Sequence, residues 1–567
     1  MKASDYIAKF FYDKGIEFNY VFTGGAIAHI IDSCWKIHER SNSKLLKPIC
    51  VLHEQAGSMA MDAYSRFSGK PGLMMVTSGP GATNLLTGIA CSYYDSIPGI
   101  YITGQVRTWE LSKQNQRQLG FQETDIVNMV KGITKYSKQI KKINNIPEEL
   151  EKAYLISTTG RPGPVLLDIP MDIQWSKIQN IKRNRAKIKN TIVKKKISTT
   201  KLNEVIKLIK NSSKISILCG GGVRHSRSEK LFKRFAEKLN APVFTTYSGK
   251  ECFPNDHSAY AGMTGTMGHK PSNKNMNQSD LLFVIGSRLS WRQVRSTPKE
   301  FAKKSKIIHV DIDKGEINQK IKTKYGFDID AKVFLKEILN KISNSSITKL
   351  DYWKKKCVDD FLEYKFYKEK DILTTDKVNP YFFFEKLSKL MGNHDVIIPD
   401  TGQNVMWTMQ EIRIRKHQRL LTSWGHSPMG YSLPASMGIA AIKNIKGNII
   451  CIIGDGGMQL NIQELQTIKN YKYKIKIFIL NNHSLGAIKD FNRDNLDGRM
   501  YGTNTEYGYS HPDFCKVSKS YGFKSEKIKK NKEVIKKIKK VLSSKDTMIC
   551  DVDLGNETFV KLDPFVK

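Results

Sequence analysis

The sequence predicts an α/β protein of three domains, each a doubly wound parallel sheet with helices on both faces. Apolar, strand-like runs alternate with amphipathic helical stretches along the chain, which is the pattern of parallel sheets whose strands are joined by helices. The chain has 567 residues. That is more than one hydrophobic core normally organises, so we expect two to four domains, with three of about 180 residues as the natural division.

Each predicted domain has its own set of strands. The first domain, at 1–180, has predicted strands at 20–22, 72–78, 99–104 and 163–170. After a basic linker at 181–198, the second domain, at 199–345, begins with a helix and continues with strands at 214–222, 241–246, 280–288 and 306–313. A charged helical connection at 346–375 leads to the third domain, at 376–567, with strands at 395–402, 448–457, 475–482 and 547–554.

Composition favours a cytoplasmic protein without a membrane partner. No apolar run reaches the length needed to cross a bilayer, and residues 1–18 have helical spacing unlike a secretory signal. The nine cysteines form no CxxC pair and no Cys/His cluster at metal spacing. An odd number of scattered cysteines argues against a disulfide framework and is consistent with a reducing compartment.

The net charge of +38 raises the alternative of a nucleic-acid-binding protein. Lysines are spread along the whole chain, however, and only residues 182–196 are locally dense. A solvated linker explains that stretch better than a phosphate-binding face. We therefore expect no nucleic-acid partner.

The most specific motif is Gly454-Asp455-Gly456, followed after 24 residues by Asn481-Asn482. Both halves end very apolar predicted strands, and open α/β sheets bind ligands at the carboxyl ends of their strands. Magnesium takes oxygen ligands and commonly shares them with phosphates. We predict a magnesium site with three protein ligands: the Asp455 carboxylate, the Asn482 amide oxygen and the backbone carbonyl of Ser484.

The glycines of this motif also have a predicted role. Gly456 and Gly457 would let backbone N–H groups approach phosphate oxygens, and the helix expected at 461–471 would direct its positive end at them. Gly454, which opens the motif, is expected to bind the cofactor with them. The sequence therefore predicts a diphosphate site beside the metal.

With this motif the sequence resembles the thiamine-diphosphate-dependent enzymes, in particular the acetolactate-synthase-like branch, from about residue 3 to residue 560. The resemblance implies that thiamine diphosphate is bound through Mg²⁺. It implies that the first domain binds the pyrimidine end of the cofactor and the third domain binds the diphosphate. It also implies a homodimer or homotetramer, because the superfamily builds its site between two subunits.

Glu54, in the run His53-Glu54-Gln55, occupies the position that the resemblance assigns to the activating carboxyl group. In the family this group hydrogen-bonds to the aminopyrimidine ring of the cofactor. Without the surrounding motifs, a Glu at the start of a helix would be explained by the helix dipole. In Thr77-Ser78-Gly79-Pro80 and the residues after it, Pro80 and Asn84 match positions that face the cofactor.

Other cofactor contacts are implied by resemblance alone. Met429 holds the position whose apolar side chain enforces the bent shape of the cofactor, although a methionine is more often core filler. The run Gly402-Gln403-Asn404 resembles the family's Gly-Gln-His contact to the diphosphate, with Asn in place of His.

The acceptor side departs from the synthase pattern. Phe121 and Gln122 resemble the segment near the synthase acceptor pocket, where Gln122 would hydrogen-bond the substrate. Residues 117–120 and the short turn at 21–25 differ from that branch, and Phe491 stands where synthases that use 2-ketobutyrate have tryptophan. The identity of the acceptor therefore stays open.

The second domain resembles the part of the synthase that holds FAD. The glycine turn after a predicted strand is common to Rossmann-like sheets and is weak evidence by itself, whereas Arg288 and Arg292 match the synthase arginine spacing. We expect FAD as a structural cofactor, because the implied reaction needs no electron acceptor. The implied FAD residues are Gly220, Gly221, Gly222, Arg288, Arg292, Asp311 and Asp330.

The resemblance implies an enzyme that decarboxylates pyruvate or a related 2-keto acid and transfers the two-carbon unit to a keto acceptor. Three alternatives use the same cofactor: transfer to a keto sugar in surface-polysaccharide biosynthesis, simple decarboxylation, and hydrolysis of a cyclic diketone. A non-catalytic homologue with the same fold is a fourth. The presence of Glu54, Asp455 and Asn482 argues against the fourth.

Overall fold

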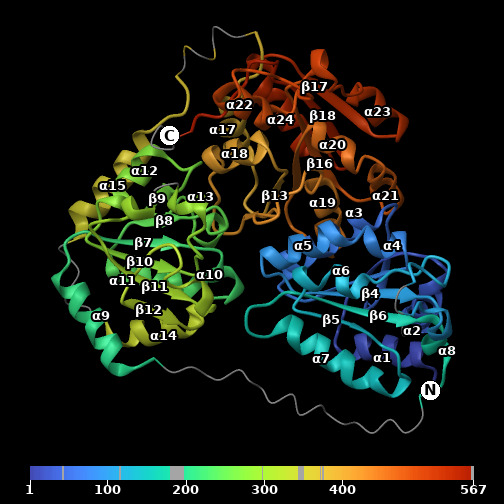
Figure 1. Cartoon of the computed structure of the whole chain (residues 1–567). Helices are drawn as coiled ribbons and strands as arrows, with labels where there is room; N and C mark the ends of the chain where they lie inside the picture. The colour runs from blue at the N-terminus through green and yellow to red at the C-terminus, as the bar shows by residue number, and fades with distance from the viewer. Residues whose placement is uncertain are drawn as a thin grey trace.

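Three six-stranded sheets, in which every strand pair is parallel, form the described part of the molecule and confirm the predicted α/β class. This computed structural model describes residues 1–40, 44–113, 116–178, 197–295, 298–342, 350–368, 370, 372 and 376–562. The predicted linker at 181–198 lies outside these ranges except for its last two residues. In Figure 1 the three sheets form three lobes, coloured blue to cyan, green, and orange to red.

The N-terminal sheet has the strand order β2-β1-β3-β4-β6-β5. Its strands are β1 (Phe18–Phe22), β2 (Lys47–Cys50), β3 (Gly72–Val76), β4 (Gly99–Gln105), β5 (Tyr136–Gln139) and β6 (Pro164–Pro170). Its helices are α1 (Ala3–Asp13), α2 (Ala28–Arg40), α3 (Glu54–Ser68), α4 (Pro80–Thr83), α5 (Leu86–Tyr94), α6 (Ile126–Met129), α7 (Ile146–Thr158) and α8 (Met171–Trp175).

The central sheet has the order β12-β11-β10-β7-β8-β9. Its strands are β7 (Ile215–Cys219), β8 (Val243–Thr245), β9 (Tyr260–Met263), β10 (Leu281–Ile285), β11 (Lys306–Asp311) and β12 (Tyr325–Asp328). Its helices are α9 (Thr199–Asn211), α10 (Gly222–His225), α11 (Glu229–Leu239), α12 (Lys270–Asn277), α13 (Trp291–Val294), α14 (Ala331–Lys341) and α15 (Asp351–Glu363).

The C-terminal sheet has the order β14-β13-β15-β16-β18-β17. Its strands are β13 (Val396–Pro399), β14 (Arg419–Leu420), β15 (Ile449–Gly454), β16 (Ile475–Asn481), β17 (Lys524–Ile528) and β18 (Met548–Asp553). Its helices are α17 (Pro380–Leu390), α18 (Gln403–Glu411), α19 (Ser432–Ala440), α20 (Asp455–Leu460), α21 (Glu464–Asn470), α22 (Gly486–Asn495), α23 (Phe514–Ser520) and α24 (Val534–Ser543).

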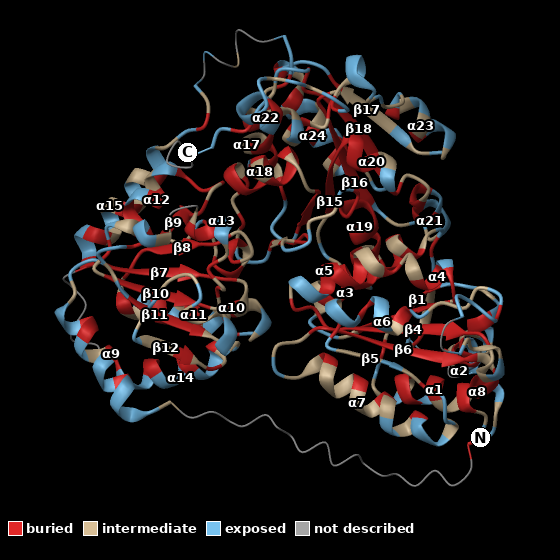
Figure 2. Cartoon of the chain, in the orientation of Figure 1, coloured by how far each residue is buried: buried red, intermediate tan, exposed pale blue. Residues whose placement is uncertain are grey.

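The inner strands form the cores of the lobes. In Figure 2 they are red, whereas the outward faces of the surrounding helices are pale blue. Every residue of β4, β10 and β16 is buried. A strand that is covered on both faces needs a continuous apolar sequence, so these strands could be predicted from the sequence. Within the described ranges, every helix is too short or too polar to span a bilayer.

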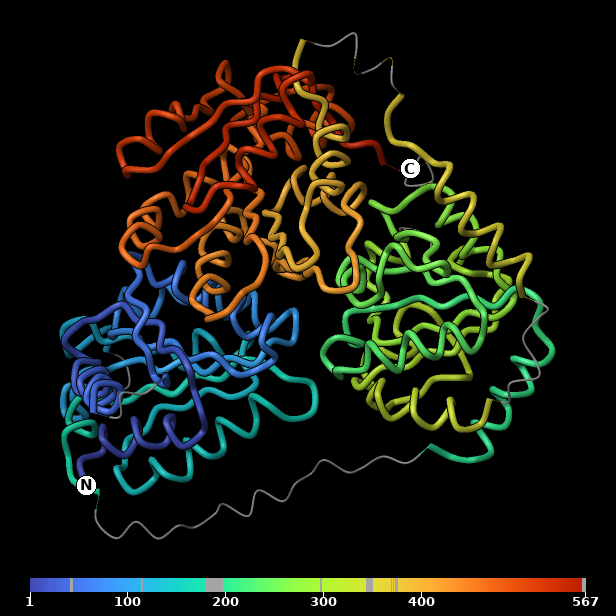
Figure 3. The backbone as a smooth tube through the Cα atoms, turned by 180° about the vertical axis from the view of Figure 1, so that it is seen from behind, coloured from blue at the N-terminus to red at the C-terminus, as the bar shows by residue number. Residues whose placement is uncertain are grey.

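The N-terminal and C-terminal lobes pack through α3 and α19, which lie together in Figures 1 and 3. A Cβ atom on Gly438 of α19 would lie 2.0 Å from the Ala60 carbonyl oxygen of α3, so only glycine permits this approach. The Tyr431 hydroxyl donates to Asp62 at 2.6 Å, and the Trp424 N–H donates to Asp95 at 2.6 Å. These contacts fix one lobe against the other.

The helix whose first turn holds the diphosphate glycines is not the one expected at 461–471. Helix α20 begins at Asp455 itself, with Gly456 and Gly457 in its first turn, and the expected helix corresponds to the later α21. The two glycines made the earlier start hard to predict because glycine disfavours helix interiors. The three sheets lie within the predicted domain ranges, whose boundaries stay a prediction.

Candidate functional site

Glu54 lies at the carboxyl edge of the N-terminal sheet, as the first residue of α3. The ring of His53 accepts from the Gln55 N–H at 3.1 Å and caps this helix. Glu54 is 5% exposed, and the Asn84 amide donates to its Oε2 atom at 2.9 Å. Pro80 is the first residue of α4, and Asn84 follows its last residue as the C-cap. The structure therefore brings Glu54, Pro80 and Asn84 together.

Gln122 packs against the same turn. A Cβ atom on Gly79 would lie 2.9 Å from the Gln122 Cβ atom, and Gln122 has a positive φ of 63°. Phe121 beside it is 86% exposed in a single chain. Glu123, the third residue of the Phe121-Gln122-Glu123 segment and one without a predicted role, anchors this loop by accepting from the N–H groups of Ser112 at 2.6 Å and Leu119 at 2.8 Å.

Asp455, Asn482 and Ser484 meet at the carboxyl edge of the C-terminal sheet. Strands β15 and β16, which precede them, are neighbours. The Asn482 amide oxygen lies 3.2 Å from Asp455 Oδ1 and 2.7 Å from the Ser484 carbonyl oxygen, while its Nδ2 atom donates to Gln403 Oε1 at 2.8 Å. Oxygen atoms of all three residues therefore come together around the Asn482 amide oxygen.

This convergence fits a divalent cation. Exchanging the amide oxygen and nitrogen of Asn482 would turn two oxygen contacts into hydrogen bonds but would set its oxygen against Gln403 Oε1. The Asp455 Oδ2 atom is buried and has no hydrogen-bond partner among the described residues. Burial raises the pKa of Asp455 to about 6, and Tyr509 and His511 offset only part of the effect. A bound cation would favour the ionised carboxylate.

Other predicted diphosphate residues lie close to Asp455. A Cβ atom on Gly454 would lie 2.8 Å from the Asn404 amide nitrogen, and one on Gly456 would lie 3.0 Å from the Met429 Cε atom. Gly402 has a φ of 91° and begins the turn into α18. The structure thus places Asn404 and Met429 beside the two glycines that flank Asp455, and Gly402 at the start of the helix that carries Asn404.

The buried carboxyl group of Asp400 joins the residues that follow Met429 to the glycines that follow Asp455. It accepts from the N–H groups of Gly430 at 2.9 Å and Tyr431 at 3.0 Å. A Cβ atom on Gly457 would lie 2.1 Å from its Oδ2 atom. The segment that carries Met429 is therefore fixed against the first turn of α20.

The two clusters belong to different sheets. One contains Glu54 and Asn84, and the other contains Asp455, Asn482 and Ser484. In the described part of a single chain, no hydrogen bond or ion pair joins them. One chain therefore holds the two clusters on separate sheets.

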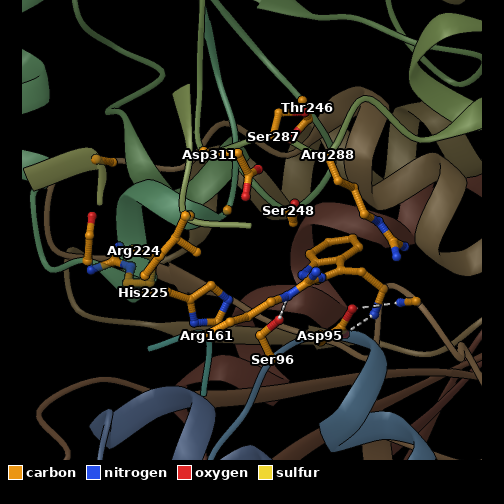
Figure 4. A pocket seen from close by; sticks show the side chains of 18 of the residues that line it. Asp95, Ser96, Arg161, Arg224, His225, Thr246, Ser248, Ser287, Arg288 and Asp311 are labelled. Carbon is orange, nitrogen blue, oxygen red and sulfur yellow. Dashed lines mark hydrogen bonds between the residues drawn. The ribbon is translucent and has the colours of Figure 1, made fainter. Parts of the chain in front are cut away.

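A cavity of about 520 Å³ opens between all three lobes. Such a volume is typical of small-molecule and cofactor sites. Figure 4 shows Asp95 and Arg161 of the N-terminal lobe and Arg224 and Asp311 of the central lobe around it. Leu421, Trp424 and Gly425 of the C-terminal lobe also line it. The cavity is thus built by the whole molecule.

Six of the seven predicted FAD residues line this cavity: Gly221, Gly222, Arg288, Arg292, Asp311 and Asp330. Among the described residues, the guanidinium groups of Arg288 and Arg292 have no ion-pair partner. Burial raises the pKa of Asp311 to about 6. Gly220 is not a lining residue; a Cβ atom on it would lie 2.1 Å from the Gly286 carbonyl oxygen, so it lets two turns pack together.

Sequence reasoning missed the cavity residues outside the central lobe. Arg161 lies on the loop after α7, bonds Asp313 at 2.7 Å and donates to Ser96 at 2.8 Å. Asp95 accepts from Arg66 at 2.7 Å. Neither Arg161 nor Asp95 belongs to a spaced motif. The sequence marks Arg161 as a charged residue in a glycine-proline turn at 160–163, which is weak evidence for a binding site.

Three family models match the chain. They are the N-terminal TPP binding domain of thiamine pyrophosphate enzymes at residues 1–129, the central domain at 202–338 and the C-terminal TPP binding domain at 400–552. These matches fall on the three lobes in order.

Full-length relatives are also found. The chain is 35% identical to a probable acetolactate synthase large subunit of Methanocaldococcus jannaschii, over 97% of this chain and 92% of the relative. It is 33% identical to the acetolactate synthase large subunit of Buchnera aphidicola, over 99% and 96%. It is 30% identical to a chloroplastic acetolactate synthase of Nicotiana tabacum, over 99% and 83%.

Proposed function

Because this chain belongs to the thiamine pyrophosphate enzymes, in the family of acetolactate synthase large subunits, we propose that it is a carboligase. It decarboxylates pyruvate, or a closely related 2-keto acid, and transfers the two-carbon acetyl unit to a keto acceptor. The relatives that support this activity are named acetolactate synthases.

One observation carries the proposal. The amide oxygen of Asn482 lies 3.2 Å from the Asp455 carboxylate and 2.7 Å from the Ser484 carbonyl, and a buried oxygen of that carboxylate has no partner among the described residues. This is the ligand chemistry of Mg²⁺, which commonly completes its shell with phosphate oxygens. These three residues would hold the metal and, through it, the diphosphate.

The other predicted site residues have proposed roles that follow from their positions in the fold. When bound, thiamine diphosphate supplies the carbon nucleophile and electron sink for decarboxylation. The Glu54 carboxyl group would hold a proton at the pyrimidine end, oriented by the Asn84 amide. Met429 would support the bent cofactor, and Gln122 and Phe121 would face the keto substrate.

We propose that the complete site forms between two copies of the chain. A single chain holds Glu54 and the metal cluster on different sheets without a bond between them in its described part. Phe121 and Tyr501 are 86% and 89% exposed in one chain, as expected for apolar side chains that a partner covers. The functional unit is then a homodimer or a dimer of homodimers.

We further propose FAD as a structural ligand of the three-lobe cavity. Arg288 and Arg292, whose guanidinium groups have no ion-pair partner in the described ranges, are available to a diphosphate, and Asp311 and Asp330 offer acceptors for ribose hydroxyls. The carboligase reaction requires no net electron transfer. FAD would therefore hold the lobes together.

The alternatives differ in the fate of the two-carbon unit. The relatives do not favour a keto-sugar acceptor, simple decarboxylation or diketone hydrolysis, since they are named acetolactate synthases. Phe491 lies on α22, just beyond the turn that carries Asn482 and Ser484, and is 55% exposed in one chain. Its side chain would form part of the pocket for the acceptor. A second pyruvate is the acceptor we propose.

The test is to incubate the chain with pyruvate, thiamine diphosphate and Mg²⁺ and to identify products by mass spectrometry. We expect acetolactate and CO₂. Glu54→Gln should lower kcat by about 100-fold or more, because a carboxyl group that moves a proton is worth that much. The control Glu151→Gln removes a carboxylate that pairs with Lys14 on the same lobe and should leave kcat unchanged. Acetaldehyde as the sole product would contradict the proposal.

A further inference from the structure

His483 lies between two of the proposed metal ligands and is held from both sides. Its Nδ1 atom is 2.8 Å from His511 Nε2, and its Nε2 atom is 3.2 Å from Asp553 Oδ1. His483 has a φ of 54°, in the left-handed region that side-chain-bearing residues seldom adopt. The turn that presents Asn482 and Ser484 therefore has an uncommon backbone shape with a pinned side chain.

The sheet places Asp553 where it can hold this turn. Asp553 ends β18 and pairs in register with Asn481, the last residue of β16. It is 8% exposed and accepts from Lys377 Nζ at 2.9 Å and from the Gly555 N–H at 3.1 Å. Two donors besides His483 thus fix the carboxylate on a rigid inner strand.

His511 holds the turn from the opposite side. It ends a segment, residues 500–511, that covers the metal turn: the Leu485 N–H donates to the Thr503 carbonyl at 2.8 Å, and Ser484 forms a bridge with Asn504. The same segment also reaches the residue after Asp455, because the Tyr509 hydroxyl lies 3.4 Å from the position that a Cβ atom on Gly456 would take. The contact between His483 and His511 joins this covering segment to the turn.

We propose that Asp553, His483 and His511 are positioning residues for the divalent cation. By fixing the His483 ring between a carboxylate and a second imidazole, they hold the Asn482 amide oxygen and the Ser484 carbonyl where Asp455 can share a cation with them. None of the three is a metal ligand. Groups that orient ligands from outside the coordination sphere commonly contribute 10- to 100-fold to metal affinity. This inference rests on the proposed function, because it assumes the Mg²⁺ site.

The test compares Mg²⁺ binding by the full-length wild type and Asp553→Asn, using calorimetry at saturating thiamine diphosphate. We expect Asp553→Asn to bind Mg²⁺ about 10- to 100-fold more weakly. The matched control is Asp551→Asn, two residues earlier on the same strand, which removes a buried carboxylate paired with Lys527 at 3.1 Å. It should bind Mg²⁺ as the wild type does.

A second variant separates side-chain positioning from backbone shape. Asparagine tolerates the left-handed region but cannot span from Asp553 to His511, so His483→Asn should show the same loss of Mg²⁺ affinity as Asp553→Asn. Thermal unfolding without Mg²⁺ checks that both variants are folded. Wild-type Mg²⁺ affinity in folded His483→Asn or folded Asp553→Asn would overturn the inference. A wild type whose thiamine diphosphate binding does not depend on Mg²⁺ would instead overturn the proposed function.

Discussion

At the scale of single residues, the proposed metal site lowers the stability of the protein without metal. The Asn482 amide oxygen faces Asp455 Oδ1 at 3.2 Å and the Ser484 carbonyl oxygen at 2.7 Å, and the buried Asp455 Oδ2 atom has no hydrogen-bond partner among the described residues. A buried acceptor without a donor costs about 1–3 kcal/mol. Such a cost is explained if a cation normally offsets it, because residues at binding sites commonly sacrifice stability for function.

Asp455→Asn should therefore separate stability from cofactor binding. The new amide can donate to the Asn482 oxygen, so without Mg²⁺ we expect unfolding stability to rise by about 1 kcal/mol. Mg²⁺-dependent binding of thiamine diphosphate should be lost, because the only carboxylate among the three proposed ligands is gone. Calorimetry and thermal unfolding measure the two effects. Retained Mg²⁺-dependent binding would contradict the assignment of Asp455.

Some residues of this site could be predicted from the sequence and others could not. Asp455 and Asn482 could be predicted because each directly follows an apolar strand and their spacing is distinctive. His511 and Asp553 lie 28 and 70 residues from His483 and share no pattern with it. Only the fold brings them together, so their contact with the metal turn could not be predicted.

At the scale of elements, burial decided which strands were predictable. The four inner strands of each sheet were all predicted, and the strands missed are the edges: β2, β5, β9, β12, β14 and β17. β5 reads Tyr-Ser-Lys-Gln and β17 reads Lys-Ser-Glu-Lys-Ile. Edge strands are commonly short and charged, which prevents pairing with other chains but removes the apolar signal.

The two-residue strand β14 depends on an acid from another lobe. Glu251 bonds Arg419 at 2.7 Å, accepts from the Leu420 N–H at 3.1 Å and lies 3.5 Å from Arg224. Burial raises the pKa of Glu251, but these partners overcome it and hold the pKa at about 2. The central lobe therefore fixes the edge of the C-terminal sheet.

Glu251→Gln should show this link as a pH effect. The folded pKa lies below the unfolded value of 4.5, so the stabilisation is fully present above about pH 4.5 and is lost as the pH falls towards 2. We expect the variant to be less stable at pH 7 by about 3 kcal/mol, with the gap to wild type closing on acidification.

Urea unfolding across this pH range measures the gap. The control Glu229→Gln removes another acid that pairs with Arg224 but leaves β14 untouched. A gap between Glu251→Gln and wild type that stays constant from pH 7 to pH 3 would rule out this role for Glu251.

At the scale of the whole molecule, the three lobes share two sites. The cavity of about 520 Å³ is lined by all three, with Asp95 from the N-terminal lobe, Arg288 from the central lobe and Trp424 from the C-terminal lobe. The proposed catalytic site needs the N-terminal lobe of one copy and the C-terminal lobe of another. The resemblance implied which lobes share the catalytic site, whereas for the cavity the sequence indicated the central lobe alone and not the two lobes that help to enclose it.

The cavity ligand can be tested by colour. Protein expressed with sufficient riboflavin should be yellow, with flavin absorbance in a near-stoichiometric amount. Arg288→Met should bind FAD about 10- to 100-fold more weakly, since a charged hydrogen bond to a diphosphate is lost. The control Arg227→Met removes an exposed arginine that donates to Gly69 on the neighbouring lobe and does not line the cavity. Colourless wild-type protein would contradict FAD binding.

The central claim is that Glu54 and the Asp455 metal cluster of different copies form one site, and subunit complementation tests it most directly. Glu54→Gln and Asp455→Asn chains, each nearly inactive, are unfolded together, mixed in equal amounts and refolded. We predict recovery of about a quarter of wild-type carboligase activity, because half of the dimers are mixed and each mixed dimer has one intact site. No recovery, with mixed dimers demonstrated by differently tagged chains, would contradict the claim.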